Sequence, residues 1–237
     1  MGDMIKKPRE IKSIAEIKKL KSSEELGDMA FSYVLDRIKP GMSEIEVALL
    51  IEFFLRKNGA EKLSFDTIVA SGVRSAMPHG TASKKIIEKG DMLTLDFGCV
   101  LDGYCSDMTR TVHIGAITDE EKEVYDTVLK AQTTALSEIS VGKNLKDIDK
   151  VARDIIKDAG YGEYFGHSLG HSVGIEIHEN PCFSPKAEGN VQNGQVISVE
   201  PGIYIDGKFG VRIEDLVLIS DGKAESLSKS TKELILI

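Results

Sequence analysis

The 237-residue sequence has no tryptophan, only six prolines and three cysteines, and no long apolar run. Cys99, Cys105 and Cys182 are an odd set of thiols without a CxxC pair, which excludes a disulfide framework and a zinc ribbon. The longest uncharged apolar runs, at 47–51 and 234–237, are far shorter than the ~20 residues that cross a bilayer. We therefore expect a soluble protein of the reducing cytoplasm.

Positive charge is also scarce, because 30 Lys and Arg against 38 Asp and Glu give a net charge of −8. Such an acidic chain is a poor nonspecific ligand for polyanions, so we expect neither nucleic acid nor an anionic membrane as a partner. Hydrophobic residues make up 41% and charged residues 29% of the chain, which is ordinary for a globular domain with a buried core.

Helical and strand-like patterns alternate twice along the chain. Helices are expected at 24–39 and 43–58, and again at 118–139 and 144–159, and each pair is followed by strand-like sequence. The dipeptide Asp102-Gly103 predicts a tight hairpin turn in the first strand region. The order predicts an α+β domain of two helix-helix-strand-strand halves.

A constant shift of 101 residues relates these halves. The segment IKPGMSEIEVALLIEFFLRKNG from Ile38 aligns without a gap with ISVGKNLKDIDKVARDIIKDAG from Ile139. In both, glycines 18 residues apart bracket the helix, and a capping residue, Ser43 or Asn144, precedes it. Two unrelated capped helices would also share this arrangement of capping residues and glycines. An internal duplication with a pseudo-twofold axis is nevertheless the preferred interpretation.

Four acids interrupt apolar strand sequence. Asp96 lies in MLTLDFG, Asp107 in YCSDMTRT, Glu200 in VISVEPG and Glu214 in VRIEDLVLI. Any one of them alone could be an edge-strand or ion-paired group, since an unpaired buried carboxylate is costly. Four such acids, two in each half, favour a shared metal site, in which two divalent ions would neutralise their charges.

The histidines gather in GHSLGHSVGIEIHENP, which contains His167, His171 and His178. Its glycines oppose a helix and it has no HExxH pair, so we expect a turn that enters a strand. His79 lies in the Pro-Gly loop SAMPHGTAS, from which it could reach a site. His113 is about 20 Å along its strand from the second acid and is not expected to be a ligand.

Together, the contexts LDFG, SDMTRT, GHSVG, VEPGIYI and GVRIED closely resemble the five-ligand dinuclear site of the pita-bread metallopeptidases, which have a curved antiparallel sheet. The resemblance extends from about residue 10 to the end. The run HxxGHxxGxxxHExP and the 14-residue gap between Glu200 and Glu214 are similar to the Xaa-Pro branch, which contains aminopeptidase P and prolidase.

The resemblance implies two divalent metal ions, with manganese as the first choice and cobalt or zinc as alternatives. It implies that Asp107 and Glu214 bridge both ions, that Asp96 completes one coordination sphere, and that His171 with Glu200 completes the other.

The same resemblance implies roles for the neighbouring residues. Glu200 would act as general base and then general acid for a hydroxide that bridges the metals. His178 would donate to the developing oxyanion, His79 would contact substrate near the scissile bond, and His167 would line the proline side. Apart from the resemblance, Arg212 stands two residues before Glu214 and on a strand would point to the same face. There it could hold Glu214 or neighbouring acids, receive a substrate carboxylate, or form only an ion pair.

The expected function is cleavage between an N-terminal residue and proline by an Xaa-Pro aminopeptidase. The alternatives are an Xaa-Pro dipeptidase and then a methionine aminopeptidase. A metal-free pita-bread binding module, or a creatine-hydrolysing relative, is opposed by the complete ligand set.

The Xaa-Pro branch usually carries an extra amino-terminal domain. Here residues 1–22 are expected to be a lead or linker, so that 1–237 form a single catalytic domain without that extra domain. The resemblance leaves a homodimer open.

Overall fold

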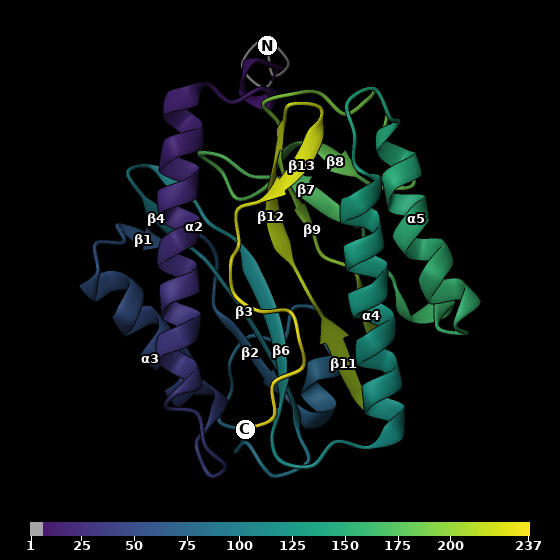
Figure 1. Cartoon of the computed structure of the whole chain (residues 1–237). Helices are drawn as coiled ribbons and strands as arrows, with labels where there is room; N and C mark the ends of the chain where they lie inside the picture. Colours follow the sequence, from purple (N-terminus) through teal and green to yellow (C-terminus); the bar gives the residue numbers. More distant parts are fainter. Residues whose placement is uncertain (1–6) are drawn as a thin grey trace.

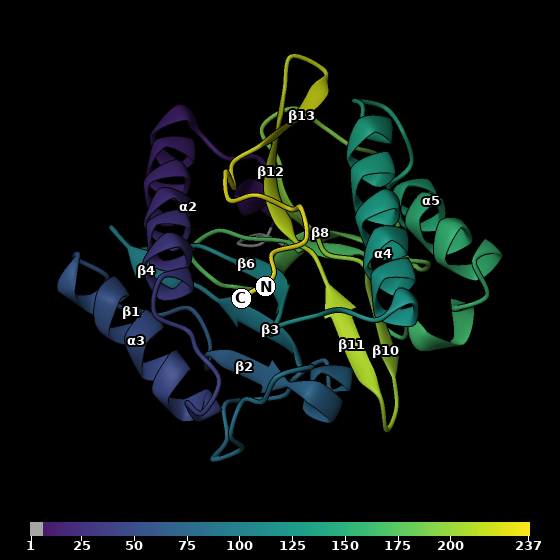
Figure 2. The same cartoon turned by 60° about the horizontal axis from the view of Figure 1, so that its bottom comes forward.

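A computed structural model of the chain describes residues 7–237. Two helices flank each side of a central layer of strands, and both views show this separation (Figure 1, Figure 2). One pair is α2 (Ile14–Leu35) with α3 (Glu44–Lys57), and the other is α4 (Asp119–Glu138) with α5 (Leu145–Asp158). The α+β architecture of two halves is confirmed.

The strands are short and lie between the helix pairs. They are β1 (Lys62–Leu63), β2 (Ile68–Ser71), β3 (Met92–Phe97), β4 (Cys99–Leu101), β5 (Tyr104–Cys105), β6 (Met108–His113), β7 (Gly170–Ser172), β8 (Glu179–Phe183), β9 (Val196–Val199), β10 (Gly202–Ile205), β11 (Phe209–Arg212), β12 (Asp215–Ser220) and β13 (Lys223–Ser226). They pair in the orders β2-β3-β6, β13-β12-β9-β7-β8, β10-β11 and β1-β4-β5, and these named strands pair antiparallel. The expected hairpin turn joins β4 to β5, with Asp102 and Gly103 at φ 50° and 78°.

The strand register in the second half brings two acids together. Asp215 of β12 pairs with Val199 of β9 in an antiparallel ladder. Glu214 directly precedes Asp215, and Glu200 directly follows Val199. Because the two strands are antiparallel, both acids lie at the same end of this ladder.

The duplicated helices begin and end at equivalent positions. α3 and α5 have the same bounds at a shift of 101 residues, since Glu44 corresponds to Leu145 and Lys57 to Asp158. Ser43 and Asn144 accept hydrogen bonds at the two N-termini. The glycines that bracket the helices have φ between 90° and 106°, a range that favours glycine.

The first helix is longer than the sequence suggested. α2 begins at Ile14 instead of residue 24 and ends at Leu35 instead of residue 39. Lysines weaken the apolar periodicity of its first turns, but Ser13 forms a capping box with Glu16 and Leu20 is fully buried. Part of the expected lead or linker, residues 1–22, therefore belongs to a packed helix. Residues 1–6 of that segment lie outside the described residues.

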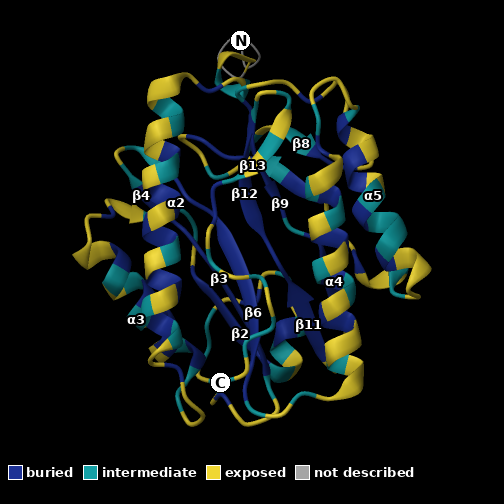
Figure 3. Cartoon of the chain, in the orientation of Figure 1, coloured by how far each residue is buried: buried dark blue, intermediate teal, exposed yellow. Residues whose placement is uncertain are grey.

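Each pair of helices covers its own apolar core, and the strands between the helices are buried along most of their length (Figure 3). Phe31, Ile51 and Leu95 are buried in the first core, and Val128 and Ile197 in the second. Each such side chain contributes about 1.5–3 kcal/mol when removed from water, so the strand ends that meet between the two cores are held firmly. None of the helices within residues 7–237 is long and apolar enough to cross a membrane.

Candidate active site

A cavity of about 470 Å³ is lined by strand ends and loops from both halves. All nine side chains proposed from the sequence line it, namely His79, Asp96, Asp107, His167, His171, His178, Glu200, Arg212 and Glu214. His113 is absent from this wall: it is buried on β6, with Nε2 3.4 Å from Glu121. The sequence therefore identified a set of residues that the fold brings together.

Three of the four acids lie at strand ends, whereas the sequence suggested that all four lie inside strands. Only Asp96 is inside a strand, on β3. Asp107 directly precedes β6, Glu200 directly follows β9, and Glu214 lies between β11 and β12. At these ends the backbone leaves the regular ladder, and the N–H of Glu214 donates to the carbonyl of Thr109 at 3.1 Å. This departure lets the side chains converge from different strands.

Three carboxylates form the centre of the cluster. Asp96, Asp107 and Glu214 are 8%, 4% and 2% exposed, and one oxygen from each lies within 4.8 Å of the others. His171 extends the cluster, because its Nε2 lies 3.5 Å from Asp107 Oδ2 and 3.3 Å from Glu200 Oε1. The five proposed ligands are thus contiguous.

Hydrogen bonds fix the orientation of these acids. Arg212 donates from Nη2 to Asp96 Oδ2 at 2.5 Å and from Nε to Thr109 Oγ1 at 3.1 Å. Thr109, which pairs with Asp96 across β3 and β6, donates from Oγ1 to Glu214 Oε2 at 2.7 Å. On the opposite side, the N–H of Asp107 donates to Glu24 Oε2 at 3.2 Å. Supporting groups therefore come from both halves.

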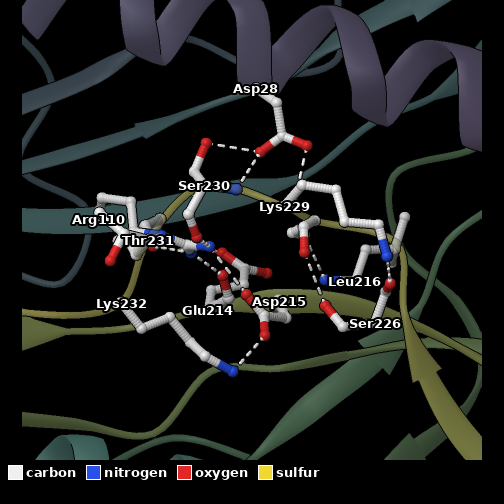
Figure 4. Close-up of polar contacts among 12 residues, drawn as sticks. Asp28, Arg110, Glu214, Asp215, Leu216, Ser226, Lys229, Ser230, Thr231 and Lys232 are labelled. Atoms are coloured by element: carbon white, nitrogen blue, oxygen red, sulfur yellow. Dashed lines mark hydrogen bonds and ion pairs between the residues drawn. The ribbon is translucent and has the colours of Figure 1, made fainter.

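A second network of polar contacts is centred on the buried pair of Arg110 and Asp215 and includes Glu214 (Figure 4). Arg110 donates from Nη2 to Asp215 Oδ1 at 2.8 Å, and Lys232 donates to the other oxygen of Asp215 at 2.7 Å. Arg110 also donates to the carbonyls of Thr109 and Glu214, and to those of the segment 230–231. The guanidinium thus joins the backbone of Glu214, strand β6, which follows Asp107, and the C-terminal segment.

The cluster of acids has an excess of negative charge. Burial and the charges of Glu214 and Asp96 hold the pKa of Asp107 well above its usual range. Burial, with the charges of Glu200 and Asp96, does the same to the pKa of Glu214, and burial raises the pKa of Glu200 to about 7. Arg212 supplies one positive charge against the four carboxylates.

This arrangement fits divalent cations. Asp96 Oδ1 and Glu214 Oε1 are buried and have no hydrogen-bond partner within the described chain. Unpaired buried carboxylate oxygens are unfavourable unless a cation approaches them. Carboxylates with one imidazole suit Mn²⁺ or Co²⁺ at least as well as Zn²⁺. The residues that would hold the ions are Asp96, Asp107, His171, Glu200 and Glu214.

The histidines form another part of the wall. The rings of His171 and His178 lie 4.4 Å apart between centroids, and burial lowers the pKa of both. His167 lies 2.9 Å from the hydroxyl of Tyr204 through Nε2, and burial lowers the pKa of His167 to about 4. These imidazoles are therefore neutral near pH 7 in the metal-free chain.

Sequence reasoning missed several residues that support the site. Thr109 has the same strand parity as Asp107, and Tyr204 follows Glu200 closely in the run VEPGIYI, so each had a local signal. The sole sign that Glu24 supports the site is that this acid lies on the buried face of α2. It is fully buried, and burial raises its pKa to about 8.

The chain is similar to several known proteins. The profile of metallopeptidase family M24 matches residues 18–221. An Xaa-Pro dipeptidase of Pyrococcus horikoshii is 47% identical over 235 residues, which are 99% of this chain and 67% of that protein. The solved structure of an Xaa-Pro dipeptidase from Bacillus anthracis matches with a TM-score of 0.98 at 49% identity, over 99% of this chain and 66% of that one.

A solved X-Pro aminopeptidase from Thermotoga maritima matches with a TM-score of 0.96 at 45% identity, over 100% of this chain and 67% of that one. The chain thus spans about two thirds of the length of these proteins.

Proposed function

The chain belongs to metallopeptidase family M24 and has the pita-bread fold, and on this premise we propose that it hydrolyses the bond between an N-terminal residue and a following proline. The observation that carries the proposal is the buried cluster of Asp96, Asp107 and Glu214, whose oxygens lie within 4.8 Å of one another. His171 and Glu200 would complete a site for two divalent ions, with Mn²⁺ as the first choice.

When bound, the metal ions would supply a water of lowered pKa and polarise the scissile carbonyl. Glu200 would accept the proton of the attacking water and pass it to the proline nitrogen, acting from the edge of the cluster. Ser198 supports this role, because its hydroxyl donates to Glu200 Oε1 at 3.0 Å and keeps the carboxylate turned toward His171.

The remaining wall residues would bind and orient the peptide. His178 would donate a ring N–H to the carbonyl oxygen as negative charge develops there. His79 would contact the substrate near the scissile bond, and His167 with Tyr204 would form the wall that receives the proline ring. The His167–Tyr204 contact of 2.9 Å supports a rigid wall on that side.

Among Xaa-Pro peptidases, we rank the dipeptidase first. The Pyrococcus and Bacillus anthracis proteins, at 47% and 49% identity, both carry this name. The sequence alone had favoured the aminopeptidase.

The aminopeptidase is the second candidate. It is favoured because Arg212, the cation that could bind the carboxylate of a dipeptide, is already engaged within the protein. A dipeptidase needs a cation for the free carboxylate of its substrate, and Arg212 is the single Lys or Arg that lines the cavity within residues 7–237. Its side chain is 4% exposed, and its guanidinium already donates to Asp96, Thr109, Tyr204 and the carbonyl of Pro78.

The test is hydrolysis by metal-stripped protein reloaded with Mn²⁺, assayed on Xaa-Pro, Xaa-Pro-Yaa and Met-Ala-Ser peptides. Cleavage confined to Xaa-Pro supports the dipeptidase, and release of the first residue from Xaa-Pro-Yaa supports the aminopeptidase. Asp107→Ala should abolish either activity, whereas Asp126→Ala, which removes an exposed acid of α4, should not. Cleavage of Met-Ala-Ser alone, or of none of the peptides, would contradict the proposal.

A further inference from the structure

The chain directly before α2 lies behind the histidine wall of the cavity. The N–H of Lys12 donates to the carbonyl of Gly194 at 2.8 Å, and the Lys12 side chain is only 2% exposed. Its Nζ donates to Ser172 Oγ at 2.8 Å and to Glu179 Oε2 at 3.3 Å. A lysine ammonium is thus buried between two segments that are distant in sequence from it.

Glu179 is the centre of this contact and is also buried, with a side chain that is 4% exposed. Its Oε1 accepts from Arg9 Nε at 3.2 Å and from the N–H of Glu176 at 3.1 Å. The loop folds tightly over this carboxylate, since a Cβ on Gly174 would lie 2.5 Å from Glu179 Oε1. The conformation of the loop 174–178 therefore depends on where Glu179 is held.

The two partners of Lys12 are the immediate neighbours of two proposed site residues. Ser172 follows His171 on β7, and Glu179 follows His178 at the start of β8. The rings of His171 and His178 lie 4.4 Å apart. One ammonium therefore connects the backbone positions that carry a metal-ligand candidate and an oxyanion-donor candidate.

Stability alone does not account for this ion pair. Removing two charges from water is costly, and well-packed apolar side chains in place of a buried pair are often neutral or stabilising. Burial also lowers the pKa of Lys12, which reflects this penalty. What the pair does supply is a fixed geometry between the two strands that it joins.

We propose that Lys12 is a positioning residue, whose ammonium between Ser172 and Glu179 sets the place of His178 relative to His171. The proposal rests on the function proposed above, because its effect on turnover acts through His178. It also gives part of the expected lead segment a specific role in the site.

The first test is Lys12→Met in the full chain loaded with Mn²⁺. Loss of an outer group that orients site residues typically lowers activity about 10–100-fold, and we expect a loss of about tenfold in kcat with little change in KM. Lys21→Met is the matched control, since Lys21 lies on α2, which begins two residues after Lys12, and forms an exposed pair with Glu225 at 3.0 Å. The control should keep wild-type kcat.

A double-mutant cycle separates positioning from a general structural effect. In a His178→Ala background, Lys12→Met should lower kcat no further, because the residue through which it acts is absent. Equal effects of Lys12→Met in both backgrounds, or wild-type kcat for Lys12→Met, would overturn the proposal.

Hydrogen exchange provides a readout that does not need turnover. In Lys12→Met, and in Glu179→Gln should the first variant fold poorly, backbone amides of 172–180 should exchange at least severalfold faster than in wild type, with no such change in Lys21→Met. Unchanged exchange in this segment would refute the proposal. Absence of Xaa-Pro hydrolysis by the wild type would instead contradict the proposed function, and exchange would still decide the role of Lys12.

Discussion

Arg212 and Asp96 form a buried ion pair that joins the two halves, with Nη2 and Oδ2 2.5 Å apart. Arg212 is on β11 and Asp96 on β3, so the guanidinium crosses from one half to the other. The sequence left three roles open for Arg212, namely holding acids, receiving a substrate carboxylate, or simple ion pairing. Its four hydrogen bonds within the protein favour the first, with Asp96 as its partner acid.

We predict that Arg212→Lys weakens Mn²⁺ binding about 10–100-fold, as is typical when an outer-shell partner of a metal ligand is lost. A lysine has one compact ammonium and cannot reproduce the directions in which the guanidinium donates to Asp96, Thr109 and Tyr204. Titration calorimetry of the metal-stripped protein measures the change. Arg37→Lys, an exposed replacement on the first half, is the control, and equal affinity in both variants would argue against the assignment.

Glu214→Gln should have opposite effects on the metal-free and metal-loaded protein. Because burial and neighbouring charge raise the pKa of Glu214, its ionised form destabilises the metal-free fold at pH 7. Gln removes the charge and keeps an acceptor for Thr109, so the Tm of the metal-free variant should equal or exceed that of wild type.

The same variant should lose most of the stabilisation that Mn²⁺ gives to wild type, which is about 2.7 kcal/mol at a concentration of 100 times Kd. Thermal unfolding with and without Mn²⁺ measures both effects, and Glu120→Gln, at an exposed pair with Lys208, controls for loss of one charge. An undiminished Mn²⁺ shift in Glu214→Gln would be incompatible with its role as a ligand.

The candidate site residues could be recognised from the sequence more readily than the residues that hold them in place. Residues such as Asp96 and His171 were recognisable because a carboxylate in an apolar strand, or a histidine in a glycine-rich run, conflicts with its local pattern. Arg110 and Lys12 gave no such signal. Their partners, Asp215 and Glu179, lie more than a hundred residues away, and only the tertiary fold brings them together.

The helix boundaries likewise could be predicted where local signals mark them and were missed where tertiary packing decides them. α3 and α5 matched expectation to within one residue at each end because capping residues and glycines mark them locally. The early start of α2 was missed because lysines weaken the apolar periodicity of its first turns, whereas tertiary packing of residues such as Leu20 stabilises them.

The Arg110–Asp215 pair should contribute strongly to stability. Both side chains are 1% exposed, and removing one partner of a buried pair typically costs about 3–5 kcal/mol. Arg110→Met should therefore lower Tm by on the order of 10 °C. Lys232→Met removes the more exposed partner of the same carboxylate and should cost less than about 1 kcal/mol. Urea unfolding compares the two, and similar losses would contradict this assignment.

His167 should make the metal-free protein less stable in acid. Its pKa of about 4 in the folded chain lies below the ordinary value of 6.5, so between these pH values the unfolded chain binds more protons. The free energy of unfolding should rise with pH across this window, and His167→Gln should lose that part of the slope. Urea unfolding at several pH values measures it; a titration of His167 near pH 6.5 by NMR would refute the prediction.

We propose that five side chains from both halves hold two divalent ions for peptide hydrolysis. Calorimetric titration of metal-stripped protein with Mn²⁺, with Xaa-Pro hydrolysis followed at each step, tests it most directly. We expect two ions per chain and activity that requires bound metal, with both lost in Asp107→Ala. A chain that binds no Mn²⁺, or that hydrolyses the peptide equally well without metal, would contradict it.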